Sequence, residues 1–146
     1  MITAAALSIA LAGWPTQGPF ANSYTGQGLS FGTVHTIDAT KLGAPANAVA
    51  VQMTGILIIT HGTYQETCDL TVYARPDASK SWYGYKGQTI EAHVGGGQRS
   101  NHTLFVPLSG GKFQLYLSGA QGKAQWPQGC SYGINYLVDY WVVDGD

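Results

Sequence analysis

Apolar and polar residues alternate along much of the chain, and Gly, Pro, Asn or Asp breaks the alternation at short intervals. In the segment KFQLYLS, Phe113, Leu115 and Leu117 share one face of an extended chain, and the residues between them share the other. This period of two predicts strands with one buried side. The predicted strands are Thr33–Ile37, Ala48–His61, Thr67–Arg75, Thr89–Val94, Thr103–Leu108, Phe113–Leu117, Ala124–Trp126 and Ile134–Val143.

The last predicted strand, INYLVDYWV, is apolar on both faces. The even-numbered positions from Ile134 to Val142 share one face, whereas Leu137 and Trp141 lie on the other. A strand of this kind is buried on both sides, or it is buried once and covered once by a partner.

Turn signals separate these strands, and no stretch has the pattern of an amphipathic helix of three turns. Gly110–Gly111 has the form of a two-residue hairpin turn, and Pro76 and Asp77 suit a type I turn. Short strands at regular spacing predict an all-β fold, a two-sheet antiparallel β-sandwich that is jelly-roll-like with about eight strands. We expect one sandwich domain over residues 31–146, after an N-terminal assembly or anchor segment over residues 1–30.

The first thirteen residues, MITAAALSIALAG, are apolar and uncharged. Leu7, Ile9 and Leu11 alternate with smaller residues, which favours a strand, although the alanines also suit a helix. A secretory signal would need a basic start, and no Lys or Arg precedes Lys41. The run is shorter than the roughly 20 residues of a membrane span.

We therefore expect this segment to be retained and to dock against a neighbouring subunit. The alternative is cleavage near Ala12, which would make the chain a secreted protein. The predicted assembly residues are Ile2, Leu7, Ile9, Leu11 and Trp14.

The composition restricts the partners of the protein. Charged residues make up only 10% of the 146 residues, and the formal net charge is -1 without a basic block. Nucleic-acid binding requires clustered Lys and Arg, so this function is not expected. So few charges also make a poor surface for a solitary monomer, which predicts a homo-oligomer.

Four stretches carry a resemblance to a known class of protein: HTIDATKLGAPANAVAVQMTGILI, YARPDASKSWYGY, HTLFVPLSGGKFQLYLSG and the terminal VDYWV. Over Thr33 to Val143, the chain resembles the small β-sandwich modules of tailed-phage tail fibres and other virion surface proteins. The resemblance implies a non-enzymatic decoration, spike or tail component, with a trimer favoured and other virion proteins as partners. It also implies assembly in the host cytoplasm and contact with cell-surface glycans. The alternative function is a secreted lectin-like carbohydrate-binding module.

The candidate glycan site lies in the segment SWYGYKGQT. Trp82, Tyr83 and Tyr85 offer large, rigid contact area among glycines, and such residues suit recognition of sugars or proteins. The competing interpretation is that Trp82 and Tyr85 plug one end of the sandwich. Arg99 and Asn101 are further candidates, in a predicted flexible loop HVGGGQRSNHT.

Catalytic, metal and cofactor chemistry has little support in the sequence. Cys68 and Cys130 are either a disulfide pair or two free thiols, and no CxxC, HExxH or Cys/His cluster indicates zinc. Glycoside hydrolysis needs paired carboxylates, and nothing in the sequence pairs Asp38, Asp69 and Glu91. We therefore expect no enzyme activity, no catalytic residues, no metal site and no cofactor.

Overall fold

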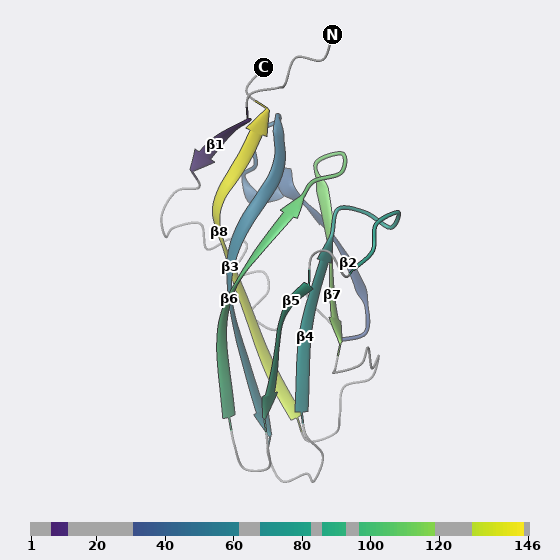
Figure 1. Cartoon of the computed structure of the whole chain (residues 1–146), viewed down its shortest axis with the longest axis vertical. Coiled ribbons are helices and arrows are strands. Elements are labelled where there is room, and N and C mark those ends of the chain that lie inside the picture. The colour runs from purple at the N-terminus through teal and green to yellow at the C-terminus, as the bar shows by residue number, and fades with distance from the viewer. Residues whose placement is uncertain are drawn as a thin grey trace.

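Eight strands form two four-stranded antiparallel sheets in the computed structural model (Figure 1). The structure describes residues 7–11, 31–61, 68–82, 86–92, 97–118 and 130–144. Sheet A has the strand order β1-β8-β3-β6, and sheet B has the order β2-β7-β4-β5. The strands are β1 (Leu7–Leu11), β2 (Val34–Asp38), β3 (Ala48–His61), β4 (Cys68–Arg75), β5 (Lys86–Ala92), β6 (Gly97–Pro107), β7 (Lys112–Ser118) and β8 (Cys130–Asp144).

The connectivity is that of a jelly roll. Every connection except β4 to β5 passes from one sheet to the other. The strands pair first with last in sequence: β1 with β8, β2 with β7, β3 with β6, and β4 with β5. This is the order of a long hairpin wrapped into two sheets, and it confirms the predicted eight-stranded sandwich.

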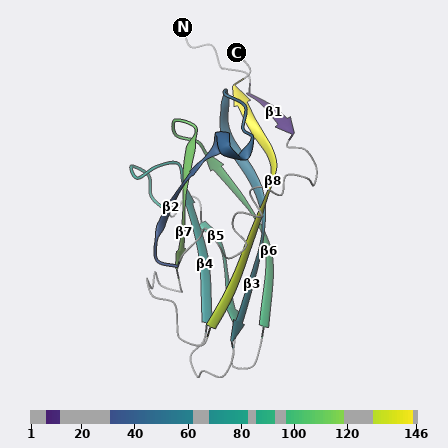
Figure 2. The same ribbon diagram turned by 180° about the vertical axis from the view of Figure 1, so that it is seen from behind.

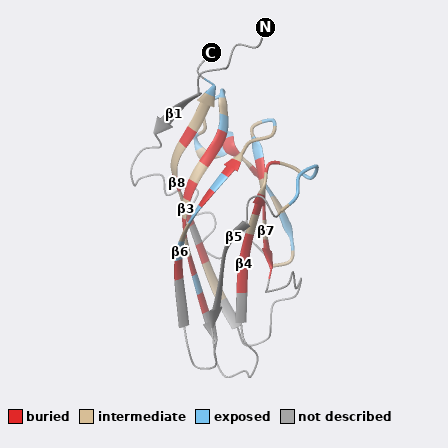
Figure 3. Ribbon diagram, in the orientation of Figure 1, coloured by how far each residue is buried: buried red, intermediate tan, exposed pale blue. Residues whose placement is uncertain are grey.

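The core lies between the two sheets, where β2, β3, β4, β6, β7 and β8 contribute buried side chains (Figure 3). Phe113, Leu115 and Leu117 of β7 are all fully buried, as their alternation in the sequence predicted. Full burial of each such side chain contributes about 1.5–3 kcal/mol. The largest fully buried side chains are Tyr136, Phe113, Met53, Leu57, Ile59, Leu70, Leu104, Leu115, Leu117 and Ile134.

A short 3-10 helix, η1 (Ala39–Leu42), joins β2 to β3 near the upper end of the sandwich (Figure 2). The Oδ1 atom of Asp38 caps its start by accepting a hydrogen bond from the Thr40 N–H at 3.0 Å, and Gly43 ends it with a φ of 90°. Hydrogen bonds from Thr40 lower the pKa of Asp38. Within the described ranges, no helix is long and apolar enough to cross a membrane.

The alternation in β8 changes phase at a β-bulge. Met53 of β3 pairs with Val138, but Gln52 pairs with Tyr140, so Asp139 is an extra residue in the ladder. Beyond the bulge it is Trp141, with 3% of its surface exposed, that enters the core. The prediction that one face runs unbroken from Ile134 to Val142 is therefore wrong after Val138, because an inserted residue moves every later side chain to the other face.

The prediction that HVGGGQRSNHT is a flexible loop is also wrong from Gly97 onward, where the structure has a strand. Gly97 begins β6, and the ladder with β3 runs from Gly97 opposite Thr60 to Pro107 opposite Ala50. The partner that orders these residues is thus the neighbouring strand of the same chain. Residues 93–96 lie outside the described residues, as does the predicted strand Ala124–Trp126.

The Gly110–Gly111 turn forms as predicted. The N–H of Ser109 donates to the Lys112 carbonyl at 2.8 Å, and the reverse bond is 3.1 Å long. Both glycines have positive φ, 57° and 75°, which only glycine adopts without strain in such a turn. The flanking strands, however, belong to different sheets, so this turn carries the chain across the sandwich.

Gly55, in the middle of β3, makes room for a large aromatic ring in the core. A Cβ at this position would overlap Cε1 of Tyr136 and lie 2.7 Å from Cε1 of His102. Both neighbours are rings held on adjacent strands, β8 and β6, and Tyr136 is fully buried. The absent side chain is therefore a packing requirement of the core.

Gly55→Ala should lower the free energy of unfolding by about 2–4 kcal/mol, because a methyl group forced into a filled core displaces its neighbours. Urea denaturation measures the change. Gly133→Ala is the matched control in β8, since a Cβ there meets nothing within 4 Å. Equal stability of the two variants would contradict this account of the core.

Candidate functional site

The outer face of sheet B carries a block of side chains from β4 and β7. The register places Tyr73 opposite Tyr116 and Arg75 opposite Gln114. Their neighbours in each strand are buried in the core, so these four side chains point away from it. The ring centroids of Tyr73 and Tyr116 are 6.4 Å apart with an interplanar angle of 44°.

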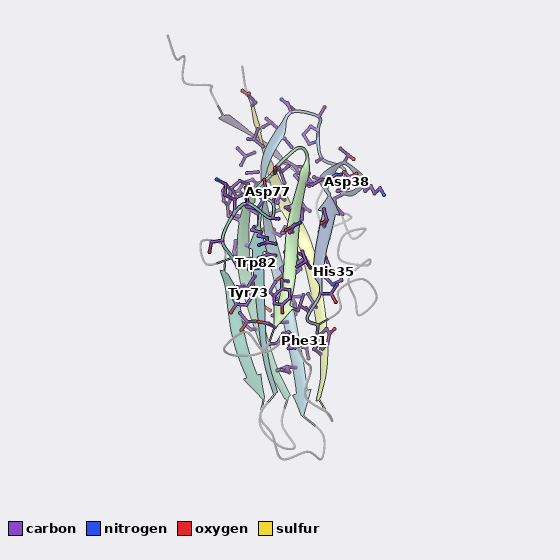
Figure 4. The ribbon with its side chains drawn as sticks, turned by 90° about the vertical axis from the view of Figure 1, so that its right-hand side faces the viewer. Phe31, His35, Asp38, Tyr73, Asp77 and Trp82 are labelled. Atoms are coloured by element: carbon purple, nitrogen blue, oxygen red, sulfur yellow. The ribbon has the colours of Figure 1, made fainter. Side chains whose placement is uncertain are left out.

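The turn after β4 brings Trp82 onto this block. The Lys80 N–H donates to the Asp77 carbonyl at 3.2 Å, and the Ser79 N–H donates to Oδ1 of Asp77 at 2.8 Å. Trp82 then packs against Tyr116, with ring centroids 5.7 Å apart and an interplanar angle of 31°. Both Trp82 and Tyr73 contact the Tyr116 ring, and Figure 4 labels both on this side of the sandwich.

Asp77 fixes this turn as an anion. Hydrogen bonds from the side chain of Ser109 and from Ser79 lower the pKa of Asp77 to about 2. Ser109 lies in the turn between β6 and β7. One carboxylate therefore connects two turns at the same end of the sandwich, and Trp82 follows directly from one of them.

Arg75 joins the parts of the block. Its Cζ atom lies 3.8 Å from the centroid of the Trp82 ring, a cation–π contact. Its Nε–H donates to Oε1 of Gln114 at 2.8 Å, and its Nη1 donates to the Lys80 carbonyl at 3.3 Å. Gln114 in turn donates to Oγ1 of Thr36 on β2 at 3.3 Å. We call the following residues the sheet B cluster: Tyr73, Arg75, Trp82, Gln114 and Tyr116.

Of the predicted glycan residues whose side chains the structure describes, Trp82 lies in this cluster. Tyr83 and Tyr85 lie outside the described residues. Asn101 is exposed on the outer face of sheet A, on the opposite side of the sandwich from Trp82. Arg99 pairs with Ile58 in the same sheet, and its side chain is outside the described part. Trp82 and Asn101 therefore do not share one site.

The other members of the cluster were not predicted. Alternation along β4 and β7 in the sequence already places Tyr73 and Arg75 on one outer face and Gln114 and Tyr116 on another. The sequence does not say that these strands are neighbours, nor in which register. That pairing assembles the cluster, and it joins strands about forty residues apart in the chain, a contact that local pattern does not encode.

The outer face of sheet A is a second candidate surface, and its chemistry differs. Ile58 of β3 and Phe105 of β6 are 44% and 46% exposed, although both are large and apolar. Ile56 of β3 and Leu137 of β8, which pairs with Thr54, are also on this face and are partly exposed. Along this face, over the part of the three strands that pairs with Gln52 to Ile58, Asp139 is the only charged side chain that the structure describes.

Part of the predicted assembly segment lies at the edge of this same sheet. Leu7–Leu11 forms β1, which pairs with β8 from Leu7 opposite Asp144 to Leu11 opposite Tyr140. The strand, and not the helix, is the correct alternative for these residues. Ile2 and Trp14 lie outside the described residues.

For four further residues singled out in the sequence, the structure describes only the backbone: Cys68, Cys130, Asp69 and Glu91. Cys68 begins β4 in sheet B and Cys130 begins β8 in sheet A, and their side chains are not among those described. The register sets Asp69 opposite Glu91, a pairing that the sequence did not reveal. Among the residues that the structure describes, no group of three or more His, Cys, Asp or Glu side chains is arranged to hold a metal ion.

A histidine and a tyrosine are in contact on the inner face of sheet A. Nε2 of His102 lies 2.7 Å from the Tyr136 hydroxyl, and the two rings make an edge-to-face contact at 5.3 Å. Nδ1 of His102 is buried without a hydrogen-bond partner among the described residues. Burial lowers the pKa of His102 to about 4 and raises that of Tyr136 well above its usual value. Both side chains are therefore neutral at pH 7.

Comparisons with known proteins show distant structural likeness. No family model and no curated protein sequence matches the chain. A protein of the native virion of Kashmir bee virus at acidic pH is 13% identical with a TM-score of 0.42, over 97% of this chain and 72% of that one. A protein of infectious bursal disease virus, Gx strain, is 16% identical with a TM-score of 0.35, over 99% and 32%. A rhamnosidase from Klebsiella oxytoca with rhamnose bound is 10% identical with a TM-score of 0.41, over 95% and 29%. The assignment of the jelly roll rests on the strand order described above.

The buried histidine predicts a loss of stability in mild acid. His102 takes up a proton near pH 6.5 in the unfolded chain but only near pH 4 in the folded one, so acid favours the unfolded chain between these values. The free energy of unfolding should fall by about 1–2 kcal/mol across this window, after allowance for the partial exposure of the ring. Denaturation in urea at pH 7 and pH 4.5 measures the fall.

His102→Gln is the control for this measurement, because glutamine can still hydrogen-bond to Tyr136 and does not titrate. Its stability should change less between the two pH values than that of the wild type. Asp77 contributes little in this window, because its carboxylate takes up a proton below pH 4 in both the unfolded and the folded chain. An identical pH dependence of both proteins would show that His102 is not the group responsible.

Proposed function

We propose that this chain is a non-enzymatic structural protein of a virion surface, which assembles with copies of itself through the outer face of sheet A. The exposed apolar character of that face carries the proposal. The jelly-roll strand order supports it, because this architecture is widely used in viral coat proteins. A trimer is the favoured assembly, in a phage-like particle built in the host cytoplasm, with other virion proteins as further partners.

Two pairs of polar groups on this face are already hydrogen-bonded within the chain. Oγ1 of Thr54 donates to Oδ2 of Asp139 at 2.7 Å, and the Tyr140 hydroxyl donates to Oε1 of Gln52 at 2.6 Å. Covering these two pairs would therefore leave few of their hydrogen bonds unmade, and burying Ile58 and Phe105 would be favourable. This supports a protein partner for the face.

A second copy is the partner that this surface fits. The net charge of -1 gives little repulsion between copies, and Asp139 is the only charged side chain that the structure describes on this face between Gln52 and Ile58. β1 extends the same sheet at its edge, and its sequence is apolar apart from one serine. In this proposal the predicted assembly residues and the outer face of sheet A belong to one interface.

Phe105→Asp should convert the assembly to folded monomers. Phe105 lies opposite Gln52, so the new carboxylate would have no cationic partner across the strand pair. A buried carboxylate without a partner costs about 3 kcal/mol or more, which raises the dissociation constant about a hundredfold or more. Size-exclusion chromatography with light scattering measures the mass. Val34→Asp is the matched control, because Val34 is similarly exposed at 44% but lies on β2 of sheet B. A wild-type protein that is a strict monomer at high concentration would refute the proposal, as would assembly that survives Phe105→Asp unchanged.

The sheet B cluster favours a second candidate function, carbohydrate binding, either as contact with a host-surface glycan or as a secreted lectin-like module. Its rings offer flat, half-buried aromatic surface, and hydrogen-bonding groups from Arg75 and Gln114 lie beside them. Aromatic surface flanked by a few fixed polar groups is the usual composition of ligand sites.

Trp82→Ala should abolish binding on a glycan array while the fold is kept. Phe105→Ala is the control, because it removes an exposed ring from the opposite sheet and should leave any signal unchanged. Circular dichroism confirms the fold of both variants. Binding that survives Trp82→Ala would place the glycan elsewhere on the protein.

A further inference from the structure

Arg75 carries a positive charge that none of its described contacts neutralises. It stacks on the Trp82 ring and donates to the Gln114 side-chain carbonyl and to the Lys80 main-chain carbonyl. All three partners are uncharged. A half-buried guanidinium with neutral partners alone is unusual, since buried charges are normally paired.

The carboxylates nearest to Arg75 in the chain are engaged elsewhere or distant. Asp77 is only two residues away, but its carboxylate accepts hydrogen bonds from Ser79 and Ser109. Asp69 lies at the other end of β4, six residues away, which corresponds to about 20 Å along a strand. That separation is about twice the Debye length at physiological salt, so Asp69 does little to neutralise Arg75.

The guanidinium is nevertheless held in a fixed position. The stack on Trp82 and the bond from Nε to Gln114 set its plane, and Gln114 is itself tied to Thr36. The described contacts use two of its five N–H groups, and a two-pronged contact with a carboxylate needs two of the others. A planar fork that is already oriented loses little entropy when it binds a carboxylate.

We infer that the sheet B cluster binds a saccharide that carries a carboxylate, such as a terminal sialic or uronic acid, with Arg75 holding the acid group and the rings of Trp82 and Tyr73 contacting the sugar. The inference rests on the carbohydrate-binding function proposed above and specifies its ligand class. Charge complementarity selects an acidic sugar over a neutral one. The aromatic rings select a sugar over a free inorganic anion, because a bare anion would leave them without contact.

A glycan array can test this with the wild-type protein. The array carries oligosaccharides ending in N-acetylneuraminic or glucuronic acid, the same oligosaccharides with the carboxylate converted to a primary amide, and counterparts ending in a neutral hexose. The acidic probes should bind at least about tenfold more tightly than their amides, as expected for a charge-assisted, two-pronged contact. Their binding should also weaken as salt is added.

Arg75→Lys tests the residue itself, because lysine keeps the charge but lacks the fork. It should weaken binding of the acidic probes about tenfold and that of any neutral probe by a smaller factor. Arg99→Lys makes the same substitution in β6 of sheet A and should change neither. The comparison of acid with amide needs no variant, so it decides the matter even if Arg75→Lys is unstable.

The possible results distinguish a failure of the proposed ligand class from a failure of the proposed carbohydrate binding. Equal binding of acid and amide would overturn recognition of the carboxylate. Neutral probes that bind, and lose binding in Trp82→Ala, would preserve carbohydrate binding while removing the acidic class. A protein that binds no probe would overturn both, and a loss caused by Arg99→Lys alone would move the acid site to sheet A.

Discussion

The inward packing of alternate residues constrains every other feature of this molecule. Both sheets must bury one side of each strand, and the core residues of β4 and β7 alternate without interruption. Their outward neighbours are therefore fixed in position, and antiparallel pairing sets Tyr73 against Tyr116 and Arg75 against Gln114. A shift of one residue in that register would dismantle both the core and the cluster outside it, so the stability of the sandwich also maintains the geometry of the candidate site.

The centre of sheet A shows what this packing demands locally. Tyr136 is too large to be accommodated unless β3 presents glycine at position 55, and the same crowded region holds the His102 ring, whose Nδ1 has no hydrogen-bond partner among the described residues. The bulge at Asp139 then changes which residues of β8 face inward and brings Trp141 into the core. The His102–Tyr136 pair places polar groups in an apolar core, and the bulge interrupts the alternation of β8. Gly55 makes room for the pair, and Oγ1 of Thr54 donates a hydrogen bond to Asp139 at the bulge.

The two outer faces have different chemistry, and this difference supports a division of roles. Sheet A presents Ile58 and Phe105 on a face that is nearly free of charge in the part the structure describes. Sheet B presents stacked rings around Arg75, held by hydrogen bonds from neighbouring strands and a turn. In the proposed function, a protein that assembles through the outer face of sheet A keeps the outer face of sheet B exposed, as the surface of a particle requires.

The sequence by itself determined the all-β class, the inward faces of β4 and β7, the limits of β3, and the Gly110–Gly111 turn, because each follows from a period of two or from local backbone preference. It also singled out Trp82, since a group of aromatic residues among glycines is visible in a linear chain. Only the tertiary structure decided which strands are neighbours. That pairing ordered Gly97–Pro107 as a strand, separated Asn101 from Trp82, and gathered the sheet B cluster from distant segments. Contacts between residues far apart in the chain depend on register and on the packing of the whole sandwich, and no local pattern specifies these.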